Sequence, residues 1–193
     1  MKSAHRTSLI FGGARSGKSA FAERLASRLL SDGKQEVLYL ATASAGDAEM
    51  KERIAHHRAR RPVHWGTLEQ SLELGATIMA HSRADNIILV DCLTVWLSNL
   101  LFSEATDFPE VGHITPPPQF AVQRQALLDA LVQTPGQIIL VSNEVGMGIV
   151  PMGAVSRWFV DEAGRLNQAV AAIADNVVWV AAGLPLYFKG QPC

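Results

Sequence analysis

A glycine-rich stretch near the start of the chain, followed by lysine and serine, contains the residue types that bind phosphate. Residues 12–19 read GGARSGKS and match the pattern G-x-x-x-x-G-K-[ST]. The glycines let main-chain N–H groups approach phosphate oxygens with no Cβ atom in the way. In this pattern the lysine reaches the β- and γ-phosphates of a nucleoside triphosphate, and the hydroxyl group contacts Mg²⁺. We therefore predict a phosphate-binding loop that consists of Gly12, Gly13, Ala14, Arg15, Ser16, Gly17, Lys18 and Ser19.

The segments on either side of this loop support the prediction. Residues 7–11 (TSLIF) form an apolar run that is short enough for a buried strand. Residues 18–30 carry apolar side chains four positions apart, which is typical of a helix. A helix that begins at the loop offers free N–H groups and partial positive charge to a phosphate. The alternative is a glycine-rich turn that arose by chance. The strand pattern before the loop and the helix pattern after it argue against that alternative.

An acidic residue at the end of a later strand is the second feature expected of a nucleotide site. Residues 87–91 (IILVD) are four apolar β-formers followed by Asp91. In proteins with this kind of phosphate loop, such an aspartate holds Mg²⁺. Any buried strand can end in aspartate, so this pattern alone does not indicate a metal site. It does so here because it follows a phosphate loop. We predict that Ser19 and Asp91 bind the metal ion.

Two adjacent histidines lie on a helix predicted for residues 47–60. At 100° per residue, His57 shares a face with Met50 and Ile54, whereas His56 lies on the polar side. We therefore expect His57 to pack inward and His56 to face solvent or a ligand; the alternative is that both are incidental surface residues. A neutral imidazole near an α-phosphate can attack the phosphorus atom and expel pyrophosphate, which leaves a nucleotidyl-histidine.

Three arginines follow these histidines closely. The segment 58–62 reads RARRP. One interpretation is a solvated basic helix end, which also suits the helix dipole. The other is a phosphate clamp, in which the guanidinium groups stabilise the charge that develops during nucleotidyl transfer.

The whole chain has the pattern of one α/β domain covering residues 1–193. It has 193 residues, of which 48% are hydrophobic, so it can bury a substantial core. Short apolar runs alternate with helical patterns, which predicts a mostly parallel sheet with helices on both faces. The loop 103–118, rich in proline, fits between two such elements.

Charge, cysteine content and hydropathy exclude several classes of protein. The net charge is −1 with acids and bases mixed along the chain, which argues against nucleic-acid binding. Two distant cysteines, Cys92 and Cys193, form neither a disulfide framework nor a zinc motif, and we expect a reducing cytoplasm. The most apolar long region, 169–188, is interrupted by Asp175 and Asn176, so we expect no membrane span.

Several further stretches resemble one enzyme family over nearly the whole chain. That family is the bifunctional adenosylcobinamide kinase / adenosylcobinamide-phosphate guanylyltransferase of cobalamin biosynthesis. Besides the phosphate loop, the resemblance rests on ATA (41–43), ERIAHHRARRPVHW (52–65), ILVDC (88–92), VSNEVGMGIVP (141–151) and GRLNQAVAAIADNVVWVAAGLPL (164–186).

The resemblance implies a P-loop NTPase with a RecA-like fold that carries out two reactions. The first phosphorylates the hydroxyl group of adenosylcobinamide with ATP or GTP. The second transfers GMP from GTP through a guanylylated histidine, giving adenosylcobinamide-GDP and pyrophosphate. It also implies Mg²⁺ as cofactor and a homo-oligomer, in the known cases a trimer.

Residue roles carry over by position. His56 matches the guanylylated histidine, and Lys18 is the catalytic residue of the phosphate loop. The resemblance implies that the remaining nucleotide contacts come from Thr42, Ala43, Ser44, Ala59, Arg60, Arg61, Pro62, Glu69 and Asp91.

Two other functions remain open on the residues alone. A small-molecule P-loop kinase without nucleotidyl transfer would form no covalent label, but it would leave the HHRARRP segment without a role. A nucleotide-dependent switch would hydrolyse triphosphate slowly and would need no corrinoid.

Overall fold

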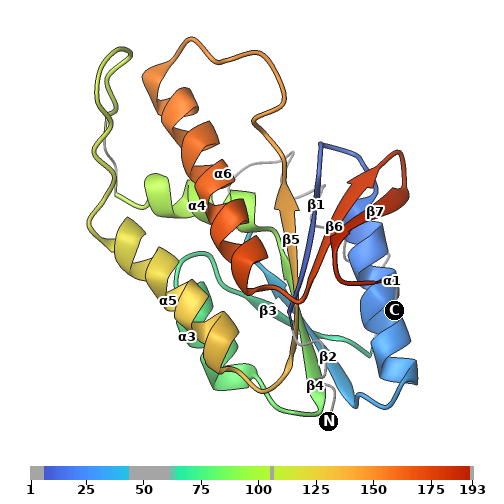
Figure 1. Cartoon of the computed structure of the whole chain (residues 1–193). Helices are drawn as coiled ribbons and strands as arrows, with labels where there is room; N and C mark the ends of the chain where they lie inside the picture. The colour runs from blue at the N-terminus through green and yellow to red at the C-terminus, as the bar shows by residue number, and fades with distance from the viewer. Residues whose placement is uncertain (1–6, 44–61, 63, 105–106, 192–193) are drawn as a thin grey trace.

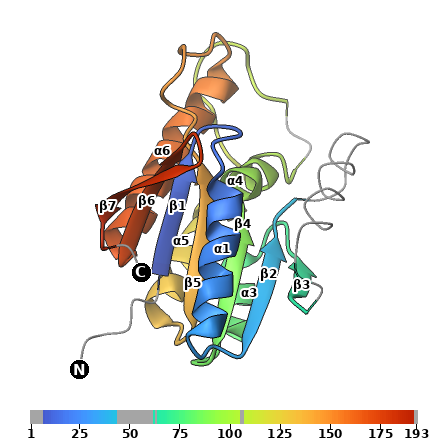
Figure 2. The ribbon, with the colours of Figure 1, turned by 90° about the vertical axis from the view of Figure 1, so that its right-hand side faces the viewer.

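The computed structural model describes residues 7–43, 62, 64–104 and 107–191, and these form one seven-stranded sheet with helices on both faces (Figures 1 and 2). The strand order is β3-β2-β4-β5-β1-β6-β7. All neighbouring strands are parallel except the pair β6 and β7. The strands are β1 (Thr7–Gly12), β2 (Glu36–Ala41), β3 (Gly66–Glu69), β4 (Asn86–Asp91), β5 (Gln137–Asn143), β6 (Asn176–Ala181) and β7 (Leu184–Lys189).

The helices divide unequally between the two faces of the sheet. Of the helices in the described residues, the first covers one face, and the other four pack on the opposite face (Figure 2). The helices are α1 (Lys18–Ser31), α3 (Leu74–His81), α4 (Leu93–Leu101), α5 (Gln119–Gln133) and α6 (Ala154–Ile173). Within the described residues, none of these helices combines the length and the apolarity needed to cross a bilayer.

Burial on both faces explains why the central strands are continuous apolar runs. In β4, Ile87 and Leu89 pack in the cluster beneath α1, whereas Ile88 and Val90 pack in the cluster beneath the other helices. All four side chains are fully buried. A parallel sheet that is covered on both sides requires apolar residues at every position of its central strands, so this pattern follows from the architecture.

Most predicted elements are confirmed, and the differences lie at their ends. Residues 66–69 pair with β2 as strand β3, and the next helix begins at Leu74. The predicted loop 103–118 contains no helix or strand in its described part. At one edge of the sheet, β7 pairs antiparallel with β6. The predicted helix over residues 47–60 lies outside the described residues.

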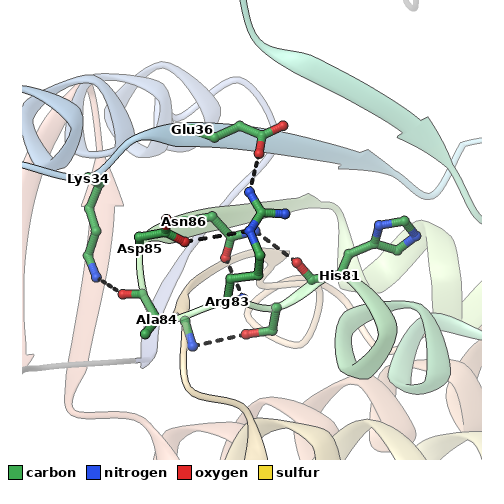
Figure 3. A network of polar contacts seen from close by, with 9 residues as sticks. Lys34, Glu36, His81, Arg83, Ala84, Asp85 and Asn86 are labelled. Atoms are coloured by element: carbon green, nitrogen blue, oxygen red, sulfur yellow. Dashed lines mark hydrogen bonds and ion pairs between the residues drawn. The ribbon is translucent and has the colours of Figure 1, made fainter.

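A polar network surrounds the turn between α3 and β4, at the end of the sheet where the parallel strands begin (Figure 3). The phosphate loop lies at the opposite end of the strands. The buried amide of Asn86 accepts a hydrogen bond from the Arg83 N–H at 2.9 Å and donates one to the His81 carbonyl at 2.8 Å. Arg83 reaches across to Glu36 at the start of β2 in an exposed ion pair. This network fixes the point at which β4 enters the sheet.

Replacing Asn86 with alanine is expected to lower the free energy of unfolding by about 1–3 kcal/mol, because both hydrogen bonds of its buried amide are lost. Arg83→Ala, which removes an exposed ion pair and keeps the amide bonds, should change stability little. Urea denaturation of both variants measures the difference. Equal effects of the two substitutions would contradict the assigned role of the buried amide.

Candidate active site

The phosphate loop occupies the carboxyl end of β1 and leads directly into α1, as its sequence predicts. A Cβ atom at Gly12 would lie 2.2 Å from the carbonyl oxygen of Val180, so no larger residue fits there. Gly17 has a φ of 94°, and a Cβ atom on it would lie 3.1 Å from the Cα atom of Gly183. The Gly183 N–H donates to the Ser16 carbonyl at 2.8 Å. Both glycines of the motif are therefore required because the loop is pressed against the end of β6 and the turn that follows.

Lys18 folds back over the loop and is ready to bind an anion. Its Nζ atom donates to the Gly13 carbonyl at 3.1 Å, and the side chain is buried. Burial lowers the pKa of Lys18, while Cys92 and Asp91 nearby act in the opposite direction. A bound phosphate would supply the negative charge that this partly desolvated ammonium group lacks.

Two further polar features of the loop fit a bound phosphate. The N-cap of α1 is Gly17, which has no side chain to cap the first N–H groups of the helix. The Ser16 hydroxyl is buried and has no hydrogen-bond partner in the described structure. Buried polar groups normally have a partner, so the loop is complete only when it holds an acceptor such as a phosphate oxygen.

Asp91 ends β4 on the same edge of the sheet, and the structure adds a residue that orients it. The hydroxyl of the buried Tyr39 donates to Asp91 Oδ2 at 2.9 Å. Tyr39 lies on β2, where Ala41 is in register with Asp91. Local sequence does not reveal this contact; its one signal is a tyrosine among the aliphatic residues of β2.

The predicted metal residues fit a magnesium ion that arrives with its nucleotide. Within the described residues, no group of three or more histidine, cysteine, aspartate or glutamate side chains could hold a metal alone. Mg²⁺ usually binds through one or two carboxylates together with substrate phosphates and water. Asp91, with Ser19 in the first turn of the helix that follows the loop, matches that type of site.

Thr42, a predicted nucleotide contact, is bonded within the protein in the described structure. The residue is fully buried, and its hydroxyl donates to the Cys92 carbonyl at 2.8 Å and accepts from the Cys92 N–H at 2.9 Å. The Thr42 carbonyl accepts a hydrogen bond from the Asn99 amide at 2.7 Å. Thr42 therefore joins the end of β2 to the residue after β4, and its contact with a nucleotide stays a prediction.

The other predicted contacts are only partly described. Ala43 and Pro62 are partly buried. Glu69 ends β3, which is separated from β1 by three strands. At about 4.8 Å per strand, Glu69 lies roughly 19 Å across the sheet from the phosphate loop, so it could reach only a distant part of a bound nucleotide. Five of the predicted site residues lie outside the described part of the chain: Ser44, His56, Ala59, Arg60 and Arg61.

An exposed apolar loop follows β5 next to the site. Met147, Ile149 and Met152 are 78%, 97% and 93% exposed. The spacing of Arg157 and Asp161 on α6 favours an ion pair, but Arg157 instead donates to the carbonyls of Pro151 and Met152. This guanidinium group therefore anchors the apolar loop to the start of α6.

Solved structures share this architecture. The flagellar accessory protein FlaH from Methanocaldococcus jannaschii is similar with a TM-score of 0.52 and 13% identity, covering 97% of this chain and 79% of that one. An ATPase from the type III secretion system of pathogenic bacteria gives a TM-score of 0.55 and 14% identity, covering 95% of this chain and 57% of that one. At such low identity these likenesses show the fold alone, a mostly parallel α/β sheet with helices on both faces, as predicted from the sequence.

Sequence comparisons identify the family. Residues 8–188 match the family model described as cobinamide kinase / cobinamide phosphate guanyltransferase, CobU. The bifunctional adenosylcobalamin biosynthesis protein CobP of Pseudomonas aeruginosa is 51% identical over 184 residues, which cover 95% of this chain and 98% of that protein. The CobU proteins of Escherichia coli and Salmonella typhimurium are 41% and 42% identical, each over 94% of this chain and 98% of the relative. The chain therefore belongs to the bifunctional cobinamide kinase / cobinamide phosphate guanylyltransferase family of adenosylcobalamin biosynthesis.

Proposed function

We propose that this protein phosphorylates adenosylcobinamide with ATP or GTP and then transfers GMP from GTP to the phosphorylated product. The observation that carries the kinase half is Lys18, which is buried over a glycine loop whose Ser16 hydroxyl has no partner in the described structure. This arrangement matches the first activity in the description of the family. The second activity is assigned to the segment with His56.

In the kinase half, the chain binds and orients the triphosphate. The N–H groups at the start of α1 and the Ser16 hydroxyl donate hydrogen bonds to phosphate oxygens, and Lys18 exchanges the Gly13 carbonyl for the β- and γ-phosphates. Ser19 and Asp91 would hold Mg²⁺, which would neutralise charge on the phosphate oxygens. Tyr39 keeps the carboxylate of Asp91 in one orientation.

In the guanylyltransferase half, His56 is the nucleophile. Its neutral ring nitrogen forms a bond to the α-phosphorus of GTP while the bond to the bridging oxygen breaks and pyrophosphate leaves. A phosphate oxygen of adenosylcobinamide phosphate then displaces the histidine, which gives adenosylcobinamide-GDP. Arg60 and Arg61 stabilise the charge on the phosphoryl group during both displacements.

We propose further that the protein acts as a homotrimer. The exposed apolar side chains after β5 and those on the edge strand β7, Leu184 and Phe188 at 72% and 62% exposure, are consistent with an interface. Light scattering on the purified protein should give a mass near three times the 20.9 kDa of the chain; a monomer would contradict this part of the proposal.

The function is tested by incubating the protein with adenosylcobinamide, ATP, GTP and Mg²⁺. We expect adenosylcobinamide phosphate to accumulate when ATP is the only nucleotide, and adenosylcobinamide-GDP with pyrophosphate to form when GTP is present. Chelation of the metal should stop both reactions. Formation of the phosphate without the GDP product would support a simple kinase, and hydrolysis of nucleotide that is independent of corrinoid would support a switch.

A further inference from the structure

Glu144, directly after β5, is a carboxylate that the steps above do not use. In the sheet, β5 lies between β1 and β4, so its carboxyl end lies between the phosphate loop and Asp91 (Figure 1). Asn143 is in register with Gly12, and Val141 with Asp91. The next residue of the chain therefore lies beside the first glycine of the loop.

The main chain at Glu144 is attached to the phosphate loop, and its side chain is held from one side. The Glu144 N–H donates to the Gly12 carbonyl at 3.0 Å. Its Oε1 atom accepts a hydrogen bond from the Gly146 N–H at 2.6 Å. The other carboxylate oxygen, Oε2, has no hydrogen bond within the described part of the chain, and the side chain is partly buried. The group is oriented and retains an oxygen that can accept a proton.

The end of β5 is a rigid support for this carboxylate. The Asn143 amide donates to the Thr94 hydroxyl at 2.6 Å, and the Asn143 carbonyl accepts from the Asn167 amide at 3.3 Å. The buried Ser142 hydroxyl donates to Asn167 Oδ1 at 2.7 Å. The strand end is thus fixed to both α4 and α6, and a catalytic group needs such fixed support.

Position in the sheet distinguishes Glu144 from the other carboxylates that end or follow parallel strands. At about 4.8 Å per strand, Glu69 is roughly 19 Å from β1, Asp91 roughly 10 Å and Glu144 roughly 5 Å. Asp91 is also engaged by Tyr39 and is assigned to the metal. Glu144 is therefore the carboxylate of this set best placed beside the terminal phosphate of a nucleotide on the loop.

We propose that Glu144 is the general base of the kinase half-reaction, an inference that rests on the proposed function. Its carboxylate accepts the proton of the substrate hydroxyl as that oxygen forms a bond to the γ-phosphorus. The bond from the γ-phosphorus to the β,γ-bridging oxygen breaks, and its electron pair leaves with the nucleoside diphosphate. Guanylyl transfer does not need this base, because its acceptor is a phosphate group that is largely ionised at neutral pH.

The test separates the two half-reactions in Glu144→Gln, which keeps the acceptor for the Gly146 N–H. We expect kcat for phosphorylation of adenosylcobinamide to fall by about 10²–10⁴-fold, the range for loss of a general base, with KM for both substrates little changed. Transfer of GMP from GTP to separately prepared adenosylcobinamide phosphate should proceed at the rate of the unmodified protein. The matched control is Glu36→Gln at the opposite edge of the sheet, which should leave both rates unchanged (Figure 3).

A kinase rate in Glu144→Gln equal to that of the unmodified protein would overturn the assignment, and so would an equal loss of both half-reactions, which indicates a structural role. If thermal unfolding shows that this variant does not fold, Glu144→Asp replaces it. The shortened carboxylate should reduce kcat for the kinase step alone, and an unchanged rate would again overturn the assignment. An unmodified protein that cannot phosphorylate adenosylcobinamide would refute the proposed function itself, which is a different outcome.

Discussion

Replacing Lys18 with alanine is expected to reduce phosphorylation of adenosylcobinamide by at least about 10²–10³-fold, the cost of removing one donor that stabilises a developing anion in a buried site. The ammonium group lies over the Gly13 carbonyl in a buried position, where water cannot replace it. Its burial lowers its pKa, which means that its charge is poorly solvated before a phosphate binds. The phosphate therefore gains a strong partner at this position, and transfer of the terminal phosphoryl group depends on it.

A second variant separates loss of charge from loss of packing at this site. Lys18→Met keeps an unbranched stem of similar length and removes the ammonium group, so it should lose activity as fully as Lys18→Ala. The matched control is Lys34→Ala, because Lys34 donates to the Ala84 carbonyl at the opposite edge of the sheet (Figure 3). The rate of adenosylcobinamide phosphate formation is the measurement. Retained activity in Lys18→Met would mean that the phosphate loop is not the kinase site.

Replacing His56 with alanine is expected to abolish covalent labelling of the protein by GTP. Incubation of the unmodified protein with GTP labelled in the α-phosphate, together with Mg²⁺, should leave an acid-labile GMP group on the chain. The reason is that only a nucleophile at the α-phosphorus forms a covalent intermediate. Formation of adenosylcobinamide-GDP should be lost with the label, while phosphorylation of adenosylcobinamide by ATP should remain.

The adjacent residue supplies the control for this experiment. On a helix, His57 faces about 100° away from His56, and its predicted place beside Met50 and Ile54 is an inward one. His57→Ala should therefore keep the GMP label. A label that persists in His56→Ala and disappears in His57→Ala would reverse the assignment, and a label in neither the variants nor the unmodified protein would favour a kinase without nucleotidyl transfer.

The architecture could be predicted from the sequence because each strand and helix has its own pattern of apolar residues within a short stretch of chain. Each central strand is buried on both faces, so the runs around Leu9, Ile88 and Leu140 are continuously apolar and stand out from the helical patterns between them. Helix starts were harder to locate. Residues 63–69 have the pattern of a short strand or loop, and pairing with β2 makes 66–69 a strand; the helix expected from Glu69 begins only at Leu74.

The phosphate-binding loop could be predicted for a similar reason. Its glycines, Lys18 and Ser19 lie within eight consecutive residues, 12–19. Their spacing is the one that lets the main chain approach a phosphate closely. Asp91 could be predicted because a strand ends at it. The segment with His56 was identified by its residue types and by resemblance, and its role stays a prediction.

The sequence by itself determined the fold class, the phosphate loop and the family of this protein. Only the tertiary structure decided which residues surround the loop. Tyr39 donates to Asp91, which is 52 positions away in the sequence, and Thr42 donates to the Cys92 carbonyl, 50 positions away. Glu144 lies beside Gly12. These contacts depend on the order in which strands are placed in the sheet and on their register. A one-residue shift in register moves every side chain of a strand to the other face. The spacing of residues along the chain contains no information on strand order or register. The residues that position the site can therefore be identified only from the assembled sheet.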